Sequence, residues 1–359
     1  MKRSSSAVQW GAGLVILVVT LFFLRSWSAR RNDGGSIHST TAASGRPTLT
    51  VGFLPVTCHL TCPVTDFATK TSGQNRFESE RFTDFPTVVE AIKSGRLDAT
   101  FMIAPLAMKL REQGVPVRIV YLGHRDGSTV MVAKDSTAKS LRDLKGKRFG
   151  IPSRYSNQYL VIRKLMEDQG MAEGDLDFQE LPPPEMPGAL ASHSIEGYFV
   201  GEPFAAKAQL DGTGRVLYMA KDIWPHFISC VLVVTDHIVK TNPEQVRDLV
   251  RGIGESGEWA QTHRLQAAKV AAPYFRQKEK LLDFVLTDPG RVSYTTLTPT
   301  DPEMQQIGDM ALKVGILKKP ISLKDMVDRE FIPASLHAAE IKVTVRRPTA
   351  APVIVAQAR

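Results

Sequence analysis

Two short apolar segments, STVMVA at residues 128–133 and SCVLVV at residues 229–234, lack a following helix of the usual kind. The chain between them alternates strand-like runs such as KRFGI and IEGYFV with helix-like runs, and this alternation predicts a mostly parallel sheet flanked by helices. A domain inserted into another domain needs one strand that leads out and one that returns. We therefore interpret the two apolar segments as a paired hinge.

The same alternation continues outward from this block. Towards the N-terminus, strands are predicted at 48–54, 97–103 and 117–123, with helices at 86–95 and 104–113. Beyond Pro243 the pattern becomes almost entirely helical, and helices are predicted at 243–262, 265–275, 278–286 and 302–315. Residues 339–359 are predicted to form a disordered tail, with a short strand at 341–345. The sequence thus predicts an α/β protein.

The basic charge of the chain is concentrated at its two ends. The formal net charge is +8, yet residues 1–31 hold five basic and no acidic side chains, and residues 342–359 hold four basic and none acidic. The body between these ends is nearly neutral. A neutral body is a poor match for a phosphate backbone, so nucleic acid is not an expected partner.

The N-terminus has the features of an export segment. Basic residues flank an apolar run at 11–24 that extends back to Ala7, which is long enough for either a signal peptide or a membrane-spanning anchor. We favour an uncleaved anchor, because basic residues stand on both sides. Residues 1–30 are therefore assigned to a signal anchor or signal peptide, and the polar residues 31–47 to a flexible linker. We expect a periplasmic or cell-envelope protein that is held at the inner membrane by residues 7–24.

Several motifs in the body are specific when taken together. The run ELPPPEMPGALASHSIEGYFVGEPFAAKA at 180–208 is accompanied by VGFLP at 51–55, SGRLDATFMIAPLA at 94–107, LKGKRFGIPSRYSNQYL at 144–160 and IWP at 223–225. These motifs resemble the nitrate/sulfonate/taurine class of ABC solute-binding proteins, most closely its nitrate- and bicarbonate-binding branch. The resemblance covers residues 48–330.

The resemblance implies a type II periplasmic-binding fold, in which two α/β lobes are joined by two crossover strands. Lobe one would comprise 48–126 plus 234–338, and lobe two 127–233. It further implies a monomer that captures a small polar molecule in the cleft between the lobes. The partners would be ABC permease and ATPase subunits, and the N-terminal helix would hold the chain at the membrane.

Ligands of open α/β sheets sit beyond the carboxyl ends of strands, against helix N-termini. Four segments are expected there: PVTCHLTCP after the first strand, Phe101 to Pro105, Arg154 to Gln158, and Gly201 to Phe204. In the first, Thr61 or Cys62 would cap a helix that starts at Pro63. The caps in the third and fourth would be Ser156 and Glu202. The residues expected to bind the ligand are Cys58, His59, Thr61, Phe85, Ala104, Pro105, His124, Tyr155, Ser156, Gln158, Glu202, Trp224 and Cys230.

Three of these residues owe their assignment to the resemblance. Phe85 matches a cleft tryptophan of the nitrate/bicarbonate branch, and Gln158 falls where that branch has a histidine. A lysine that supports anion charge is missing, and Cys230 stands near its place. A neutral group there removes a charge-assisted hydrogen bond, which favours a weakly charged solute over nitrate or bicarbonate.

All three cysteines lie on segments assigned to the cleft. Cys58 and Cys62 are the obvious disulfide pair in an exported protein. A metal site formed by the three cysteines and His59 is a second interpretation, and direct contact of a thiolate with the ligand is a third. No cofactor or metal is expected.

Two other functions compete with transport. One is an enzyme related to the synthesis of the thiamine pyrimidine precursor, which uses a dense cysteine run and an HExxH-like histidine pair. The sequence has neither, nor a GxSxG, Walker A or GxGxxG motif, so we expect no catalysis. The other is a membrane-tethered sensor of a small ligand.

Overall fold

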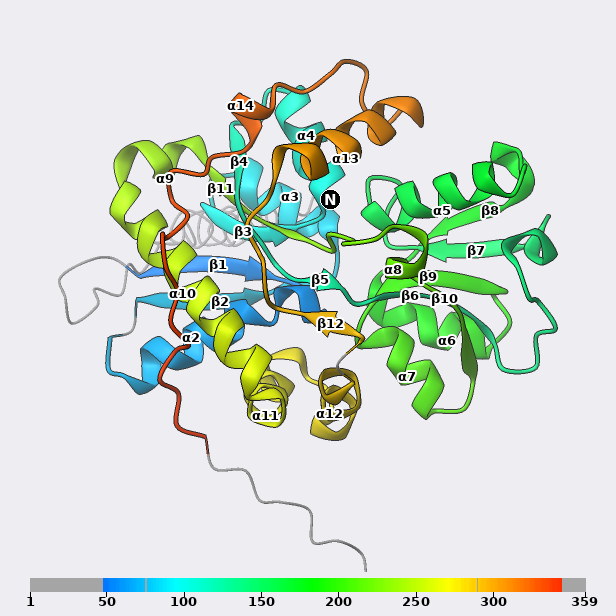
Figure 1. Cartoon of the computed structure of the whole chain (residues 1–359), viewed down its shortest axis with the longest axis horizontal. Coiled ribbons are helices and arrows are strands. Elements are labelled where there is room, and N and C mark those ends of the chain that lie inside the picture. Colours follow the sequence, from blue (N-terminus) through cyan, green and yellow to red (C-terminus); the bar gives the residue numbers. More distant parts are fainter. Residues whose placement is uncertain (1–47, 75, 289, 344–359) are drawn as a thin grey trace, which may run out of the picture. The chain divides into compact units, whose positions relative to one another are not determined.

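The computed structural model describes residues 48–74, 76–288 and 290–343, and within them it contains two five-stranded mixed sheets (Figure 1). The first sheet has the strand order β2-β1-β3-β11-β4, and the second has the order β10-β6-β9-β7-β8. A small third sheet pairs β12 with β5. The predicted α/β class is confirmed.

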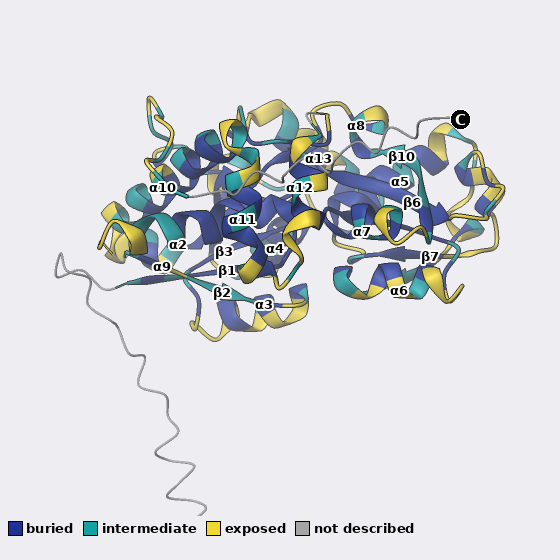
Figure 2. Ribbon diagram, turned by 90° about the horizontal axis from the view of Figure 1, so that it is seen from below, coloured by how far each residue is buried: buried dark blue, intermediate teal, exposed yellow. Residues whose placement is uncertain are grey.

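The strands of the first sheet are β1 (Leu49–Phe53), β2 (Phe77–Arg81), β3 (Ala99–Met102), β4 (Val117–Leu122) and β11 (Val231–Thr235). Those of the second are β6 (Ser128–Ala133), β7 (Arg148–Ile151), β8 (Asp177–Glu180), β9 (Gly197–Gly201) and β10 (Gly214–Met219). The third sheet consists of β5 (Arg125–Asp126) and β12 (Val292–Ser293). Every residue of β3, β6, β9 and β11 is buried, and Figure 2 shows exposed residues gathered on the outer faces of the helices.

The helices of the first lobe follow the predicted pattern. They are α2 (Thr61–Thr71), α3 (Phe85–Lys93), α4 (Ala104–Glu112), α9 (Asp236–Thr241), α10 (Pro243–Thr262), α11 (Arg264–Phe275), α12 (Glu279–Thr287), α13 (Asp301–Lys313) and α14 (Leu323–Met326). The second lobe contains α5 (Asn157–Asp168), α6 (Met186–Ala191), α7 (Phe204–Leu210) and α8 (Ala220–Ile223). Single 3₁₀ turns are η1 (Thr57–His59), η2 (Leu141–Leu144), η3 (Glu173–Asp175) and η4 (Pro183–Glu185).

The interpretation of 128–133 and 229–234 as a paired hinge is wrong in detail. The strands β6 and β11 lie in different sheets, where each runs antiparallel to both of its neighbours. Strand β6 is instead the strand by which the chain enters the second sheet, and β11 is the strand by which it returns to the first, which explains why both stand outside the repeating βα pattern. The pairing occurs just before them, where Gly123 N–H donates to Cys230 O and Asp126 N–H donates to Phe227 O, both at 2.8 Å.

Some helix starts are capped by a side chain. The Asp84 carboxylate accepts the Thr87 N–H at the start of α3, and Ser156 Oγ accepts the Tyr159 N–H at the start of α5, as predicted for Ser156. The predicted cap of α2 is wrong. That helix begins at Thr61 rather than Pro63, because the turn η1 runs almost directly into it, and its N-cap is Leu60, with no side-chain hydrogen bond.

The ends of the chain are described only in part. The predicted export segment and linker, 1–47, lie outside the described residues, as does most of the predicted tail. No helix in the described ranges is both long and apolar enough to span a membrane. Residues 341–343 are not a strand, which contradicts the described part of that prediction, and Ala339 N–H donates to Glu255 O on α10.

Candidate functional site

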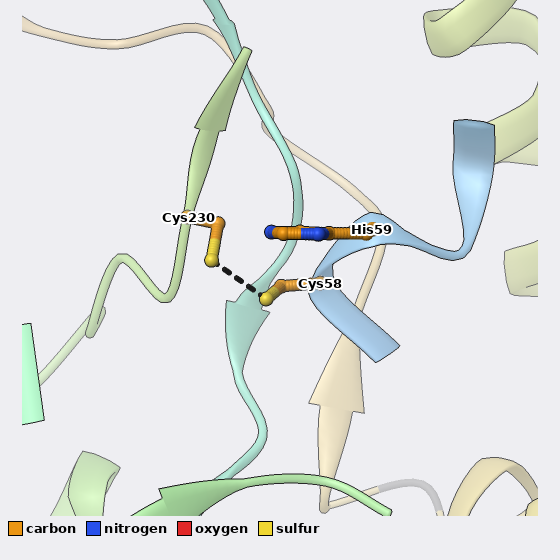
Figure 3. Close-up of side chains that lie close together, drawn as sticks. All are labelled: Cys58, His59 and Cys230. Atoms are coloured by element: carbon orange, nitrogen blue, oxygen red, sulfur yellow. Dashed lines mark hydrogen bonds between the residues drawn. The ribbon is translucent and has the colours of Figure 1, made fainter. Parts of the chain in front are cut away.

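The chain passes between the two large sheets at residues 123–126 and again at residues 227–230, which we call the first and second crossover segments. The turn η1 and the end of the second crossover segment bring three predicted site residues together. The Sγ atoms of Cys58 and Cys230 are 2.8 Å apart, and the ligand-type atoms of Cys58, His59 and Cys230 all lie within 4.8 Å of one another (Figure 3). All three side chains are buried. We call this group the thiol cluster.

The structure contradicts the predicted disulfide between Cys58 and Cys62. All three cysteines are free, and Cys62 Sγ lies 3.7 Å from Val51 O instead of facing Cys58. Cys62 follows the turn into α2, so its side chain is directed back onto β1. The metal interpretation that used all three cysteines loses one of its ligands for the same reason.

The two thiols of the cluster are electrostatically different. Burial raises the pKa of Cys58, but the hydrogen bond with Cys230 and the neighbouring His59 outweigh burial, so this pKa lies well below its usual value. Burial and the neighbouring Cys58 raise the pKa of Cys230 well above its usual value. Of the two thiols, Cys58 is therefore the one that loses its proton more readily.

His124 lies on the other side of η1. Its Nε2 is 2.9 Å from Thr57 Oγ1, and its ring meets that of Tyr294 edge-on, with the ring centres 5.5 Å apart. The Tyr294 hydroxyl in turn donates to Thr57 O at 2.9 Å. Burial lowers the pKa of His124 to about 4, so this ring is neutral near pH 7.

The start of α5 reaches the second crossover segment. Asn157 Nδ2 donates to Ile228 O, and Gln158 Nε2 donates to Ser128 Oγ at 3.0 Å. Ser156 is fully buried as the helix cap, whereas the Tyr155 side chain is 37% exposed. Sequence reasoning identified Gln158 but missed Asn157, although it directly follows the predicted cap.

Glu202 has partners within the protein. It is fully buried, its Oε1 lies 2.5 Å from Arg291 Nη1, and its Oε2 accepts the Ala206 N–H in the first turn of α7. Its backbone oxygen accepts the Thr57 N–H at 2.7 Å, which ties the end of β9 to η1. The predicted cap of α7 is wrong by one residue, because the helix begins at Phe204 and its N-cap is Pro203, although the Glu202 carboxylate still accepts a backbone N–H of the first turn. The sequence held no signal for Arg291.

The remaining predicted residues contribute apolar surface. Phe85, Ala104 and Pro105 stand at the buried first turns of α3 and α4. Trp224 lines a separate cavity of about 140 Å³ that also borders Asn157 and residues of α13. The structure therefore places Trp224 beside the crossover rather than with the thiol cluster.

The described residues contain several buried polar atoms without a hydrogen-bond partner, and these atoms concentrate around the crossover. Four of them belong to predicted site residues, namely His59 Nε2, Thr61 Oγ1, His124 Nδ1 and Gln158 Oε1, and a fifth is Asn157 Oδ1. Buried polar atoms in native proteins normally have a hydrogen-bond partner, which is a protein group, an ordered water or a ligand. The donors and acceptors are mostly uncharged.

Close packing at Gly123 holds this region together. A Cβ atom at that position would lie 2.1 Å from the Cys58 carbonyl oxygen and 3.4 Å from that of Cys230. We expect Gly123→Ala to lower the free energy of unfolding by about 1–3 kcal/mol, because backbone must move to admit the methyl group. Urea unfolding measures this change. Gly188→Ala in α6 is the control, since a Cβ there meets open space, and equal effects of the two substitutions would contradict the expectation.

These features define a class of protein: two mixed α/β sheets linked by two crossover segments, as in periplasmic binding proteins. The chain belongs to the NMT1-like family, whose family model matches residues 42–274. A Brucella abortus protein described as a binding protein is 26% identical over 261 residues, covering 70% of this chain and 81% of that protein.

Solved structures agree with this assignment. The ligand-binding component of an ABC-type import system from Staphylococcus aureus, with zinc bound, has a TM-score of 0.73 and 27% identity, and the match covers 79% of this chain and 97% of that one. The periplasmic nitrate-binding protein NrtA of Synechocystis has a TM-score of 0.70 at 16% identity, with coverage of 77% and 83%, and shows likeness of fold alone.

Proposed function

We propose that this protein is the solute-binding component of an ABC-type importer in the cell envelope. It captures a small polar molecule between its lobes, without changing it chemically, and delivers it to permease and ATPase subunits. The unsatisfied buried polar atoms around the crossover carry this proposal, because a polar solute is the partner that would satisfy them. The family membership and the import system of Staphylococcus aureus support it.

The connection between the lobes supports a clamp. We propose that residues 48–126 plus 234–338 and residues 127–233 move as two bodies about the paired segments 123–126 and 227–230. The Thr57 N–H to Glu202 O bond and the Glu202–Arg291 ion pair bridge these bodies. Their rupture and reformation would accompany opening and closure.

The solute is proposed to be weakly charged. Two arginines near the crossover have carboxylate partners: Arg291 pairs with Glu202, and Arg125 pairs with Glu303 at 2.6 Å. The position near which the resemblance predicts a lysine carries the buried Cys230. A solute with hydrogen-bonding groups and little charge fits these surroundings better than nitrate or bicarbonate.

Thr61→Val is expected to reduce solute retention without destabilising the empty protein. Valine keeps the shape of threonine and removes only a hydroxyl that has no partner, so unfolding stability should be unchanged or slightly higher. Native mass spectrometry of the freshly purified full chain would measure how much small molecule is retained. A loss of one net hydrogen bond weakens binding by about 5- to 10-fold.

Thr65→Val, one turn further along α2, is the matched control. The Thr65 hydroxyl contacts Thr61 O at 2.8 Å, Gly252 O at 3.1 Å and Ser256 Oγ at 2.9 Å, so its loss should lower stability and spare retention. The proposal fails if Thr61→Val destabilises the protein and leaves retention at the wild-type level.

A further inference from the structure

The thiol cluster joins two segments that are far apart in the sequence. Cys58 belongs to η1, which follows β1, and Cys230 directly precedes β11, 172 residues later. Their sulfur atoms are in contact at 2.8 Å, yet their side chains are only 3% and 2% exposed. Two free thiols so placed need little movement to bond to each other.

The hydrogen bonding of His59 determines what its ring offers to these sulfurs. Its Nδ1 accepts the backbone N–H of Leu54 at 2.7 Å, so the neutral ring carries its proton on Nε2. That Nε2–H has no hydrogen-bond partner, and Figure 3 shows this edge of the ring directed towards the two cysteines. His59 therefore presents a hydrogen-bond donor on the side of its ring that faces the two sulfurs.

The same tautomer argues against a metal. A metal bound at Nε2 needs a free lone pair there, which would require the proton to sit on Nδ1, opposite the Leu54 N–H. Two thiols alone form an incomplete ligand set for zinc, which takes four ligands in structural sites. The cluster fits thiol chemistry better than cation binding.

We propose that Cys58 and Cys230 form a reversible thiol–disulfide pair, with Cys58 as the attacking thiolate, Cys230 as the resolving thiol and His59 as the positioning residue. The co-reactant is a small-molecule disulfide. The opposite displacements of the two cysteine pKa values support this division of roles. The pair is testable by thiol chemistry alone, and so independently of solute binding.

The exchange has two steps. The Cys58 thiolate attacks one sulfur of the small disulfide, whose S–S bond breaks to release a first thiolate, and a mixed disulfide remains on Cys58. Cys230 then loses its proton and attacks the Cys58 sulfur, which forms the internal S–S bond and releases a second thiolate. The protein loses two electrons, the co-reactant gains them, and the Cys230 proton leaves with one of the released thiols.

The bond would have a structural consequence. It would close a covalent ring from Cys58 to Cys230 that contains the whole second sheet and the first crossover segment. Cross-linking such a long loop restricts the unfolded chain, so the oxidised protein should melt at a higher temperature than the reduced one. Because both sulfurs are buried, the exchange requires a local opening of the residues around Cys58 and Cys230.

The test uses the full chain, reduced and then equilibrated with oxidised and reduced glutathione. The intact mass of the wild type should fall by two hydrogens, with Cys62 alone remaining open to alkylation after denaturation. Cys230→Ser should accumulate a glutathione adduct on Cys58, because no resolving thiol remains, whereas Cys58→Ser should form little adduct. Cys62→Ser is the control and should oxidise like the wild type. Equal adduct on the two single variants, or no loss of hydrogens, would overturn the proposal.

His59 is tested with two substitutions. Asparagine can accept the Leu54 N–H as Nδ1 does but loses the donor at Nε2, whereas glutamine can supply a donor near Nε2. We expect His59→Asn to move the pH dependence of Cys58 alkylation by iodoacetamide to higher pH, and His59→Gln to retain more of the wild-type profile. Zinc is the competing outcome: tight retention of Zn²⁺ by the reduced wild type, with no disulfide formed, would replace thiol exchange by a metal site.

Discussion

Replacing Arg291 by methionine is expected to lower the free energy of unfolding by about 3–5 kcal/mol. The Arg291 guanidinium lies 2.5 Å from Glu202 Oε1, and the two side chains are 5% and 0% exposed. Methionine fills much of the space but leaves a buried carboxylate without its cation. Burial already raises the pKa of Glu202 although Arg291 opposes this shift, so removal of Arg291 should raise that pKa further.

Two comparisons isolate the buried charge. Glu202→Gln should lower the free energy of unfolding by less than Arg291→Met does, because Arg291 still contacts Gln209 Oε1 at 3.0 Å and Asp288 at 3.3 Å. The double variant Glu202→Gln/Arg291→Met should recover much of the loss. Urea unfolding measures all three, with Lys164→Met as the control, since its pair with Asp168 is 37% and 50% exposed and should contribute less than about 1 kcal/mol. A loss at Arg291 no larger than at Lys164 would show that the ion pair does not hold the lobes.

The pH dependence of the stability loss in Arg291→Met tests the same explanation in a second way. A carboxyl group whose folded pKa is raised favours the folded state when it is protonated. The stability that Arg291→Met loses relative to wild type should therefore become smaller as the pH falls and Glu202 takes up a proton. A stability loss that stays constant as the pH falls would mean that the substitution acts through packing, because Arg291 also lies over the Phe284 ring at 5.1 Å.

The order of strands and helices could be predicted because its signals are local. Apolar periodicity and the prolines and glycines at element ends place α10 to α13 within a few residues of the structure. The start of α2 was missed because Pro63 resembles a first-turn proline, while the chain already turns at η1. That turn is also held by non-local contacts, including the bond from Thr57 N–H to Glu202 O.

The partners within the site could not be predicted, because sheet topology sets them. Spacing along the chain suggests Cys62 for Cys58, yet the return of the second crossover to the first sheet brings Cys230 to it. Arg291 likewise reaches Glu202 from the loop between α12 and β12, which has no motif. Sequence reasoning therefore identified several residues near the crossover without identifying their contacts.

Acidification should weaken the fold through His124. Burial lowers the pKa of this ring to about 4, against an ordinary value near 6.5, so the folded protein binds fewer protons than the unfolded chain between these limits. The contribution of the neutral His124 ring to the free energy of unfolding is fully present above about pH 6.5 and is lost as the pH falls through about 4. The difference between the folded and unfolded pKa values of His124 corresponds to about 3 kcal/mol in the free energy of unfolding. The charged or titratable groups that influence the ring are Cys58, His59 and Arg264.

His124→Gln separates this contribution from all other titrating groups. Glutamine can still reach Thr57 Oγ1, which His124 Nε2 contacts at 2.9 Å, but it does not titrate. We expect the stability of wild type minus variant, measured by urea unfolding at intervals from pH 7.5 to pH 4, to fall steadily below about pH 6.5. A difference that stays constant over this range would mean that His124 is solvated and titrates normally in the folded protein. A difference that falls would show that mild acid weakens the contact of η1 with His124 at the crossover. The reason is that a charged ring cannot remain buried between Thr57 and Tyr294 without a new partner.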